Sequence, residues 1–125
     1  MADYRVLLVD DEEEFVSALS ERLMLRGIEV DSALNGEEAL ALMVEKVFEV
    51  VILDVMMPGL GGLEVLKQIK STYPNTQVIL LTGHGSTREG IEGMRLGAFD
   101  YLIKPVDIEE MLEKMKEAAR TVGTG

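Results

Sequence analysis

Short apolar runs alternate along this chain with segments whose apolar residues recur every three or four positions. The runs have the length of strands, and the segments between them repeat as one face of a helix does. The predicted strands are Tyr4–Val9, Glu29–Ala33, Val50–Leu53, Val78–Leu81 and Tyr101–Ile103. Strict alternation predicts parallel strands joined by right-handed crossovers, hence an α/β fold with a doubly wound five-stranded parallel sheet. The alternation does not determine the order of the strands.

The helical segments differ in the strength of their apolar faces. Gly27 is expected to close the first helix, and the third must end before Pro74. The apolar positions of the five helices are Phe15, Ala18, Leu19 and Leu23; Ala39, Leu40, Met43 and Val47; Leu63, Leu66 and Ile69; Ile91, Met94 and Leu96; and Ile108, Met111, Leu112, Met115 and Ala119. The fourth, near Ser86–Leu96, is rich in glycine, which lowers helix stability, and its apolar face is thin. We therefore expect it to be the element that shifts most easily.

The composition excludes several classes of protein. A length of 125 residues fits one domain. No apolar run approaches the roughly 20 residues of a membrane span, and the N-terminus lacks the features of a signal peptide, so we expect a cytoplasmic location and no membrane contact. The net charge of −11 would repel nucleic acid, and the absence of cysteine excludes thiolate metal sites.

Polar residues follow four of the predicted strands, at the point where each strand ends. Asp10 and Asp11 follow the first strand, Asp54 the third, Thr82 the fourth and Lys104 the fifth. Ligands of open parallel sheets bind beyond the carboxyl ends of the strands, so three carboxylates, a hydroxyl and an ammonium should meet there. Such a group is suited to a divalent cation and a phosphoryl group, and all-oxygen ligation favours Mg²⁺ or Mn²⁺.

Purely structural explanations compete with this interpretation to different extents. Acids at a helix start complement the helix dipole, and this explains Glu12, Glu13 and Glu14 as well as a functional role would. Thr82 could simply end a strand, and Lys104 could be a solvated lysine, although Pro105 favours an extended backbone there and would tolerate a cis peptide. Asp54 resists a structural explanation, because burial after four apolar residues penalises an unpaired charge.

These residues resemble the receiver domain of two-component response regulators. The resemblance rests on Asp10-Asp11, on Asp54 in Ile-Leu-Asp-Val-Met-Met-Pro-Gly, on Thr82-Gly83 and on Gly97-Ala-Phe-Asp-Tyr-Leu-Ile-Lys-Pro105. It implies a flavodoxin-like (βα)5 fold with strand order 2-1-3-4-5. It also implies a receiver domain over residues 1–121, with residues 122–125 as a tail or the start of a linker. Gly61 departs from the family pattern, which often has an acid there.

The resemblance assigns the chemistry to the same residues. Asp54 would accept a phosphoryl group from a histidine kinase, a phosphotransfer protein or a small phosphodonor. Asp11, Asp54 and the backbone carbonyl of Met56 would bind Mg²⁺, with Asp10 acting chiefly through a bound water. The domain would be a signalling switch that assists its own phosphorylation and dephosphorylation.

Other residues would hold the group and transmit its arrival. Thr82 and Lys104 would contact the phosphoryl oxygens, with Tyr101 as the switch aromatic. Met56 and His84 would flank the path of the hydrolytic water and tune the phosphoryl lifetime. The fourth helix, fifth strand and last helix would form the responding face, which would engage an effector protein, an effector domain or a second copy of the chain.

Two rival functions fit the residues less well. Haloacid-dehalogenase-type phosphatases also use an Asp nucleophile, a Thr or Ser, a Lys and Mg²⁺, but they carry a second Asp two residues after the nucleophile. Met56 stands at that position here. A receiver-like scaffold that is never phosphorylated would not explain why every motif residue is intact.

Overall fold

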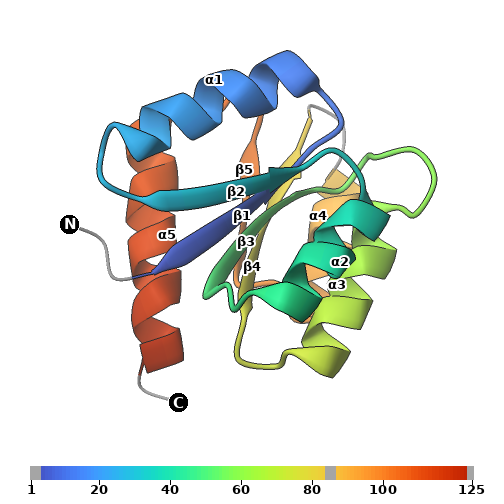
Figure 1. Ribbon diagram of the computed structural model, residues 1–125. Coiled ribbons are helices and arrows are strands. Elements are labelled where there is room, and N and C mark those ends of the chain that lie inside the picture. The colour runs from blue at the N-terminus through green and yellow to red at the C-terminus, as the bar shows by residue number, and fades with distance from the viewer. Residues whose placement is uncertain (1–3, 84–86, 124–125) are drawn as a thin grey trace.

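Five parallel strands form a single sheet in the order β2-β1-β3-β4-β5 (Figure 1). The structure is a computed structural model and describes residues 4–83 and 87–123. The strands are β1 Arg5–Val9, β2 Glu29–Ala33, β3 Val50–Asp54, β4 Gln77–Thr82 and β5 Asp100–Ile103. Both the predicted α/β class and the flavodoxin-like strand order are confirmed.

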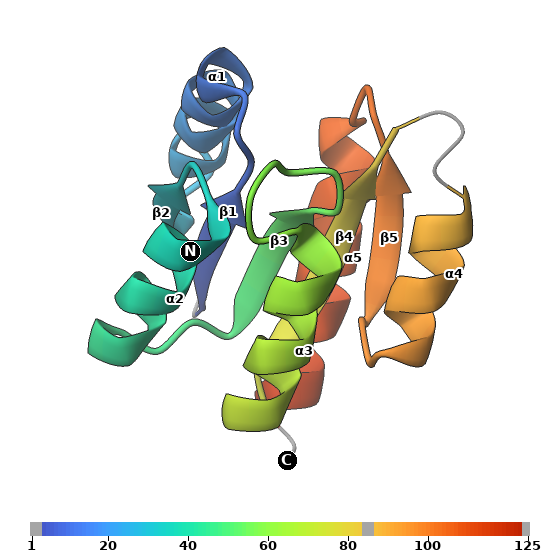
Figure 2. The same cartoon turned by 90° about the vertical axis from the view of Figure 1, so that its right-hand side faces the viewer.

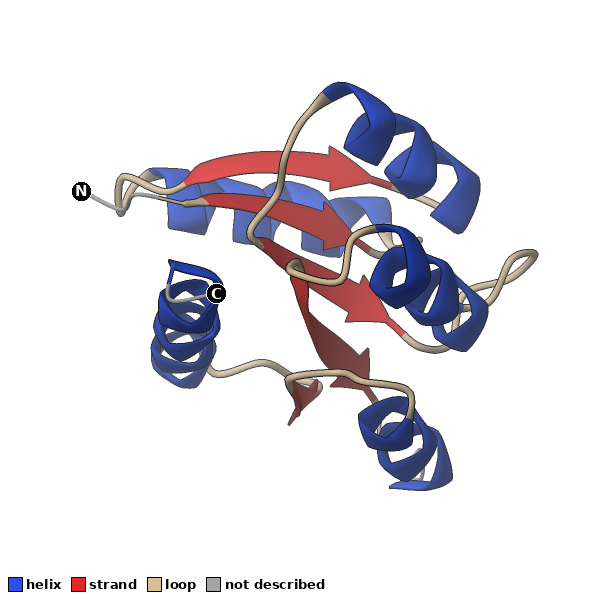
Figure 3. Cartoon of the chain, turned by 90° about the horizontal axis from the view of Figure 1, so that it is seen from below, coloured by secondary structure: helices blue, strands red, loops and turns tan. Residues whose placement is uncertain are grey.

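Helices cover both faces of the sheet (Figures 1 and 3). They are α1 Glu13–Met24, α2 Gly36–Glu45, α3 Gly62–Thr72, α4 Thr87–Arg95 and α5 Ile108–Gly123. One face carries α1 and α5, and the other carries α2, α3 and α4 (Figure 2). Within residues 4–83 and 87–123, none of the helices combines the length and apolar character that a transmembrane segment requires.

The central strands supply both hydrophobic cores, because successive side chains of a strand point to opposite faces. In β1, Leu7 and Val9 pack toward α2 and α3, whereas Val6 and Leu8 pack toward α1 and α5. Every residue of β3 is buried. A strand covered on both faces reads as a continuous apolar run, which is why the sequence revealed these strands clearly.

The parallel ladders continue past the strands and fix the residues that follow them. Asp10 N–H donates to the carbonyl of Ala33 at 3.2 Å, and Val55 N–H donates to that of Leu81 at 3.1 Å. Lys104 N–H likewise donates to the carbonyl of Thr82 at 2.7 Å. The backbones that carry the predicted site are therefore part of the sheet.

Helix ends agree with the sequence, whereas some predicted helix faces do not. Gly27 has a φ of 80° in the turn after α1, and α3 ends before Pro74. Val47 was predicted on the apolar face of the second helix, but α2 ends at Glu45 and Val47 is 74% exposed. Ala18 is also exposed, and Val16 is buried in its place.

Of the three apolar residues expected on the buried face of the fourth helix, only Leu96 packs against the core, and it is partly buried. Ile91 is 56% exposed and Met94 is 41% exposed, whereas Gly90 and Gly93 are buried. A Cβ atom added to Gly93 would lie 2.0 Å from Leu80 Cδ1, so this part of α4 lies directly against β4. The helix approaches the sheet through residues without side chains, and its apolar side chains face outward.

Candidate phosphoacceptor and metal site

Three carboxylates meet at the carboxyl ends of β1 and β3. Asp10 is fully buried, Asp54 is 6% exposed and Asp11 is exposed. One carboxylate oxygen from each lies within 4.8 Å of the other two. Three oxygen ligands, one of them open to solvent, fit a hard divalent cation that retains part of its water shell.

Burial dominates the electrostatics of Asp54 and raises its pKa. The backbone N–H of Met56 donates to Asp54 Oδ1 at 3.0 Å and opposes this effect, whereas the charge of Asp10 adds to it. Lys104 lowers the pKa and Asp11 raises it, and the net direction is upward. The ionised carboxylate of Asp54 is therefore short of positive charge, which a cation or a cationic side chain would supply.

Lys104 extends from the end of β5 into this acidic cluster. Its Nζ lies 2.7 Å from Asp10 Oδ2 and 3.8 Å from Asp54 Oδ2. Asp10 Oδ2 has this ion pair but no well-aligned hydrogen-bond donor among the described residues. Burial lowers the pKa of Lys104, but the neighbouring acids outweigh burial and raise it overall. The peptide bond between Lys104 and Pro105 is cis, as the sequence allowed.

Thr82 and Tyr101 lie on adjacent strands and meet the same part of α4. Thr82 is buried, and its hydroxyl donates to the carbonyl of Leu102 at 3.4 Å, whereas Tyr101 is 42% exposed. A Cβ added to Gly90 would lie 3.9 Å from Thr82 Cγ2 and 4.0 Å from the ring of Tyr101. The α4 backbone at Gly90 therefore lies one side chain's width from both residues expected to sense a phosphoryl group.

Of the two residues predicted to tune the phosphoryl lifetime, Met56 lies within the described part of the chain. Met56 is 60% exposed, two residues beyond Asp54, while the flanking Val55 and Met57 are buried. Its thioether offers no strong hydrogen-bonding group. His84 lies outside the described residues.

The structure adds three residues that sequence reasoning missed. A Cβ at Gly62 would lie 2.3 Å from the carbonyl oxygen of Asp54, so the start of α3 packs on the backbone of Asp54. Glu12 Oε1 accepts a hydrogen bond from Lys104 at 2.7 Å, and the Phe15 ring lies 4.6 Å from the same ammonium. The glycine pair before the third helix was a usable signal for Gly62, but nothing in the acidic run distinguished Glu12.

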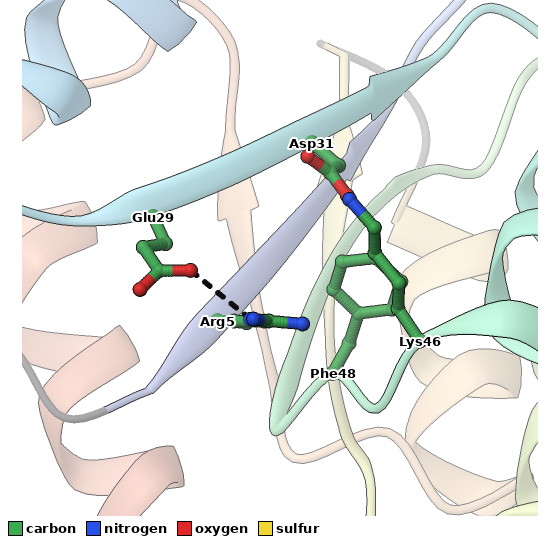
Figure 4. Close-up of a pocket in the computed structure, with 5 residues that line it drawn as sticks. All are labelled: Arg5, Glu29, Asp31, Lys46 and Phe48. Atoms are coloured by element: carbon green, nitrogen blue, oxygen red, sulfur yellow. Dashed lines mark hydrogen bonds and ion pairs between the residues drawn. The ribbon is translucent and has the colours of Figure 1, made fainter.

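A second polar hollow lies toward the amino ends of β1 and β2 (Figure 4). This pocket of about 50 Å³ is lined by Arg5, Glu29, Asp31, Lys46 and Phe48. Arg5 pairs with Glu29 at 3.0 Å and Lys46 pairs with Asp31 at 2.8 Å. Each charged group already has a partner of opposite charge, so the carboxyl-end cluster is the better candidate for a functional site.

Comparisons with known proteins point to one family. The family described as "Response regulator receiver domain" matches residues 6–116. The chain is 42% identical over 119 residues to the uncharacterized transcriptional regulatory protein YkoG of Bacillus subtilis, covering 95% of this chain and 52% of that protein. It is 40% identical over 107 residues to the regulatory protein AtoC of Escherichia coli, covering 86% of this chain and 23% of that protein. The chain thus spans about half or less of the length of these relatives.

Solved structures agree in fold. A receiver domain protein from Clostridium thermocellum superposes with a TM-score of 0.89 at 35% identity, covering 94% of each chain. The structure described as FixJ-N superposes with a TM-score of 0.88 at 32% identity, covering 96% of each chain.

Proposed function

The chain belongs to the response regulator receiver family of two-component systems, and from this membership we propose that it is a phosphorylation-dependent switch with Asp54 as the acceptor. Its donor would be a histidine kinase, a phosphotransfer protein or a small phosphodonor. The observation that carries the proposal is the placement of Asp54, whose pKa is raised by burial, beside Asp10, Asp11 and Lys104 at the carboxyl ends of the strands.

The chemistry is a transfer between two nucleophiles. One carboxylate oxygen of Asp54 forms a bond to phosphorus while the bond from phosphorus to the donor breaks, and the donor leaves with that electron pair. The product is an acyl phosphate. Because Asp54 is held by the β3 ladder and by the Met56 N–H, the protein contributes mainly by positioning the nucleophile.

A divalent cation fits the residues present. Asp11, Asp54 and the carbonyl of Met56 would hold Mg²⁺, or Mn²⁺, and Asp10 would act through a bound water. Such an ion supplies positive charge to the phosphoryl oxygens as negative charge builds up in the transition state. The fit is supported by the close approach of three carboxylate oxygens and by the raised pKa of Asp54.

Lys104 and Thr82 would contact the remaining phosphoryl oxygens. The ammonium of Lys104 is within a side-chain movement of Asp54, and Thr82 follows Leu81, the residue paired with Asp54 on the adjacent strand. A hydrogen bond from the Thr82 hydroxyl to the new group would replace its weak 3.4 Å hydrogen bond to the Leu102 carbonyl. Thr82 would then move relative to α4.

The responding surface would comprise α4, β5 and α5. It exposes the apolar side chains of Ile91, Met94, Tyr101 and Ile103, which an effector protein, an effector domain or a second copy of the chain could cover. We place this receiver unit at residues 1–121 and in the cytoplasm, although its last helix, α5, continues to Gly123. Its net charge of −11 argues against nucleic-acid binding by this segment.

The test is phosphoryl uptake from acetyl phosphate with Mg²⁺, followed by intact mass. The Asp54→Asn variant should gain no phosphoryl group and should keep its fold by circular dichroism. Asp31→Asn is the matched control, because it makes the same chemical change at a surface ion pair on β2. Uptake by Asp54→Asn, or undiminished uptake by the unmodified protein in excess EDTA, would contradict the acceptor or the cation site respectively.

The lifetime of the acyl phosphate would depend on Met56 and His84. Because Met56 cannot orient a hydrolytic water, the unmodified protein should dephosphorylate more slowly than Met56→Asn in a decay assay after donor removal. Equal or faster decay of the unmodified protein would refute the role of Met56. The sign of the His84 contribution is left to the same assay.

A further inference from the structure

Glu12 occupies the N-cap position of α1, but its carboxylate does not cap the helix. N-cap side chains normally accept a hydrogen bond from a backbone N–H of the first turn. Glu12 makes no such bond, and its Oε1 instead accepts from Lys104 Nζ at 2.7 Å, 92 residues away in sequence. Its own N–H donates to Asp10 Oδ1 at 2.9 Å, which anchors its backbone beside the acidic cluster.

The segment from Asp10 to Phe15 sets the resting position of the Lys104 ammonium. Asp10 Oδ2 and Glu12 Oε1 each lie 2.7 Å from Nζ, and the centroid of the Phe15 ring lies 4.6 Å away, within cation–π range. Asp54 Oδ2 is more distant, at 3.8 Å. The ammonium therefore rests closer to the β1–α1 connection than to the acceptor.

Glu12 differs from Asp10 in what it can do during the reaction. Asp10 belongs to the three-acid cluster and would share its charge with a bound cation, whereas Glu12 lies outside that cluster and keeps its charge for Lys104. Lys104 must approach Asp54 to reach a phosphoryl group there. The side chain of Glu12 is 64% exposed, so solvent can replace its contact with Lys104 at small cost.

We propose that Glu12 is a positioning residue that competes with the phosphoryl group for Lys104. It holds the ammonium in the resting position and releases it when the ammonium transfers to the phosphoryl oxygens. This proposal rests on the proposed role of Asp54 as the acceptor and adds a residue that controls how readily Lys104 becomes available.

The experiment compares Glu12→Gln with Glu14→Gln. The probe is beryllofluoride with Mg²⁺, titrated into each protein and followed by amide chemical shifts. Losing the competing contact should tighten beryllofluoride binding about two- to five-fold, as expected for removal of one exposed ion pair. Glu14→Gln removes the same charge two residues further along, from an exposed side chain with no ion pair to Lys104, and should change the affinity little.

A second arm separates competition for Lys104 from a general change in charge. In a Lys104→Met background, Glu12→Gln should no longer alter beryllofluoride affinity, because the group for which Glu12 competes is gone. A merely structural or long-range electrostatic role would survive this substitution. In protein that retains Lys104, Glu12→Gln should also raise the initial rate of phosphoryl uptake from acetyl phosphate, and Glu14→Gln should change it little.

Three results would overturn the proposal: equal effects of Glu12→Gln and Glu14→Gln, weaker binding by Glu12→Gln, or an effect that persists with Lys104→Met. Failure of the proposed function would look different. The unmodified protein would then show no Mg²⁺-dependent binding of beryllofluoride at all, and the acceptor role of Asp54 would fall together with that of Glu12.

Discussion

Two helices on the same face of the sheet, α3 and α4, are held in opposite ways. In α3 the side chains of Val65, Leu66 and Ile69 are fully buried. In α4 the residues toward the sheet are Gly90 and Gly93, while its apolar side chains are exposed. One helix is fixed by large buried side chains, and the other depends on close backbone contact. This difference separates a support from an element that can move.

The difference between the two helices matches their proposed roles, in which α3 supports the acceptor and α4 responds to phosphorylation. The start of α3 lies against the backbone of Asp54, because a Cβ at Gly62 would meet the Asp54 carbonyl oxygen at 2.3 Å. In contrast, α4 lies near Thr82 and Tyr101, the residues expected to respond, which a Cβ added at Gly90 would just reach. Reactive geometry benefits from rigid support, whereas switching motions arise in elements of low stability.

The largest effect should come from truncating one apolar side chain on each helix, buried in α3 and exposed in α4. Leu66→Ala in α3 leaves a cavity in the core and should lower the free energy of unfolding by about 2–5 kcal/mol. Ile91→Ala in α4 removes an exposed side chain and should change it by no more than about 0.5 kcal/mol. Urea denaturation followed by circular dichroism measures both. Similar losses for the two variants would break the comparison.

The two buried glycines of α4 should respond in opposite directions to alanine. At Gly93 the added Cβ would lie 2.0 Å from Leu80 Cδ1, inside a full core, so Gly93→Ala should destabilise by about 1–3 kcal/mol. At Gly90 the nearest atom is 3.9 Å away, an ordinary contact, so Gly90→Ala should stabilise by up to about 1 kcal/mol through helix propensity. A stabilising Gly93→Ala would show that α4 does not depend on close backbone packing.

Hydrogen exchange should sharpen the comparison without substitutions. Amides of α4 should exchange faster than those of α3, because fewer buried side chains oppose local opening. Adding beryllofluoride and Mg²⁺ should change exchange most between Gly83 and Lys104. If the largest change falls in α1 and α2, the switch has been assigned to the wrong part of the fold.

The sequence predicted α3 well and α4 poorly, for a physical reason. Leu66 and Ile69 pack inward as helical spacing predicts, because hydrophobic burial decides how α3 faces. In α4 the spacing of Ile91 and Met94 predicted a buried face, but a helix in close contact with a strand must turn its smallest residues inward. Apolar periodicity carries no information on how near two elements approach.

Prediction of the site from the sequence is limited in a similar way. Asp10, Asp54, Thr82 and Lys104 could be placed together because each follows a strand, and parallel strands bring their carboxyl ends to one edge. The strand order came only with the family resemblance. The contact between Glu12 and Lys104 could not be predicted, because the direction of a long exposed side chain is set by the folded surroundings.

The smallest expected effect concerns the free-energy cost of burying the Asp54 carboxylate beside the start of α3. Its pKa is raised, chiefly by burial, so the folded protein binds the proton more tightly than the unfolded chain. Below the ordinary Asp pKa of about 3.9 both states are protonated and no difference arises. As the pH rises from there through the raised value, unfolding releases a proton and the folded state loses stability.

Asp54→Asn, whose amide oxygen can still accept from Met56, should therefore be more stable than the unmodified protein at pH 7 without divalent cation. Thermal unfolding should show this advantage shrinking toward pH 3.5, and Mg²⁺ should reverse it at pH 7 by stabilising only the unmodified protein. An advantage that is independent of both pH and Mg²⁺ would mean that the substitution acts through packing rather than through the charge of Asp54.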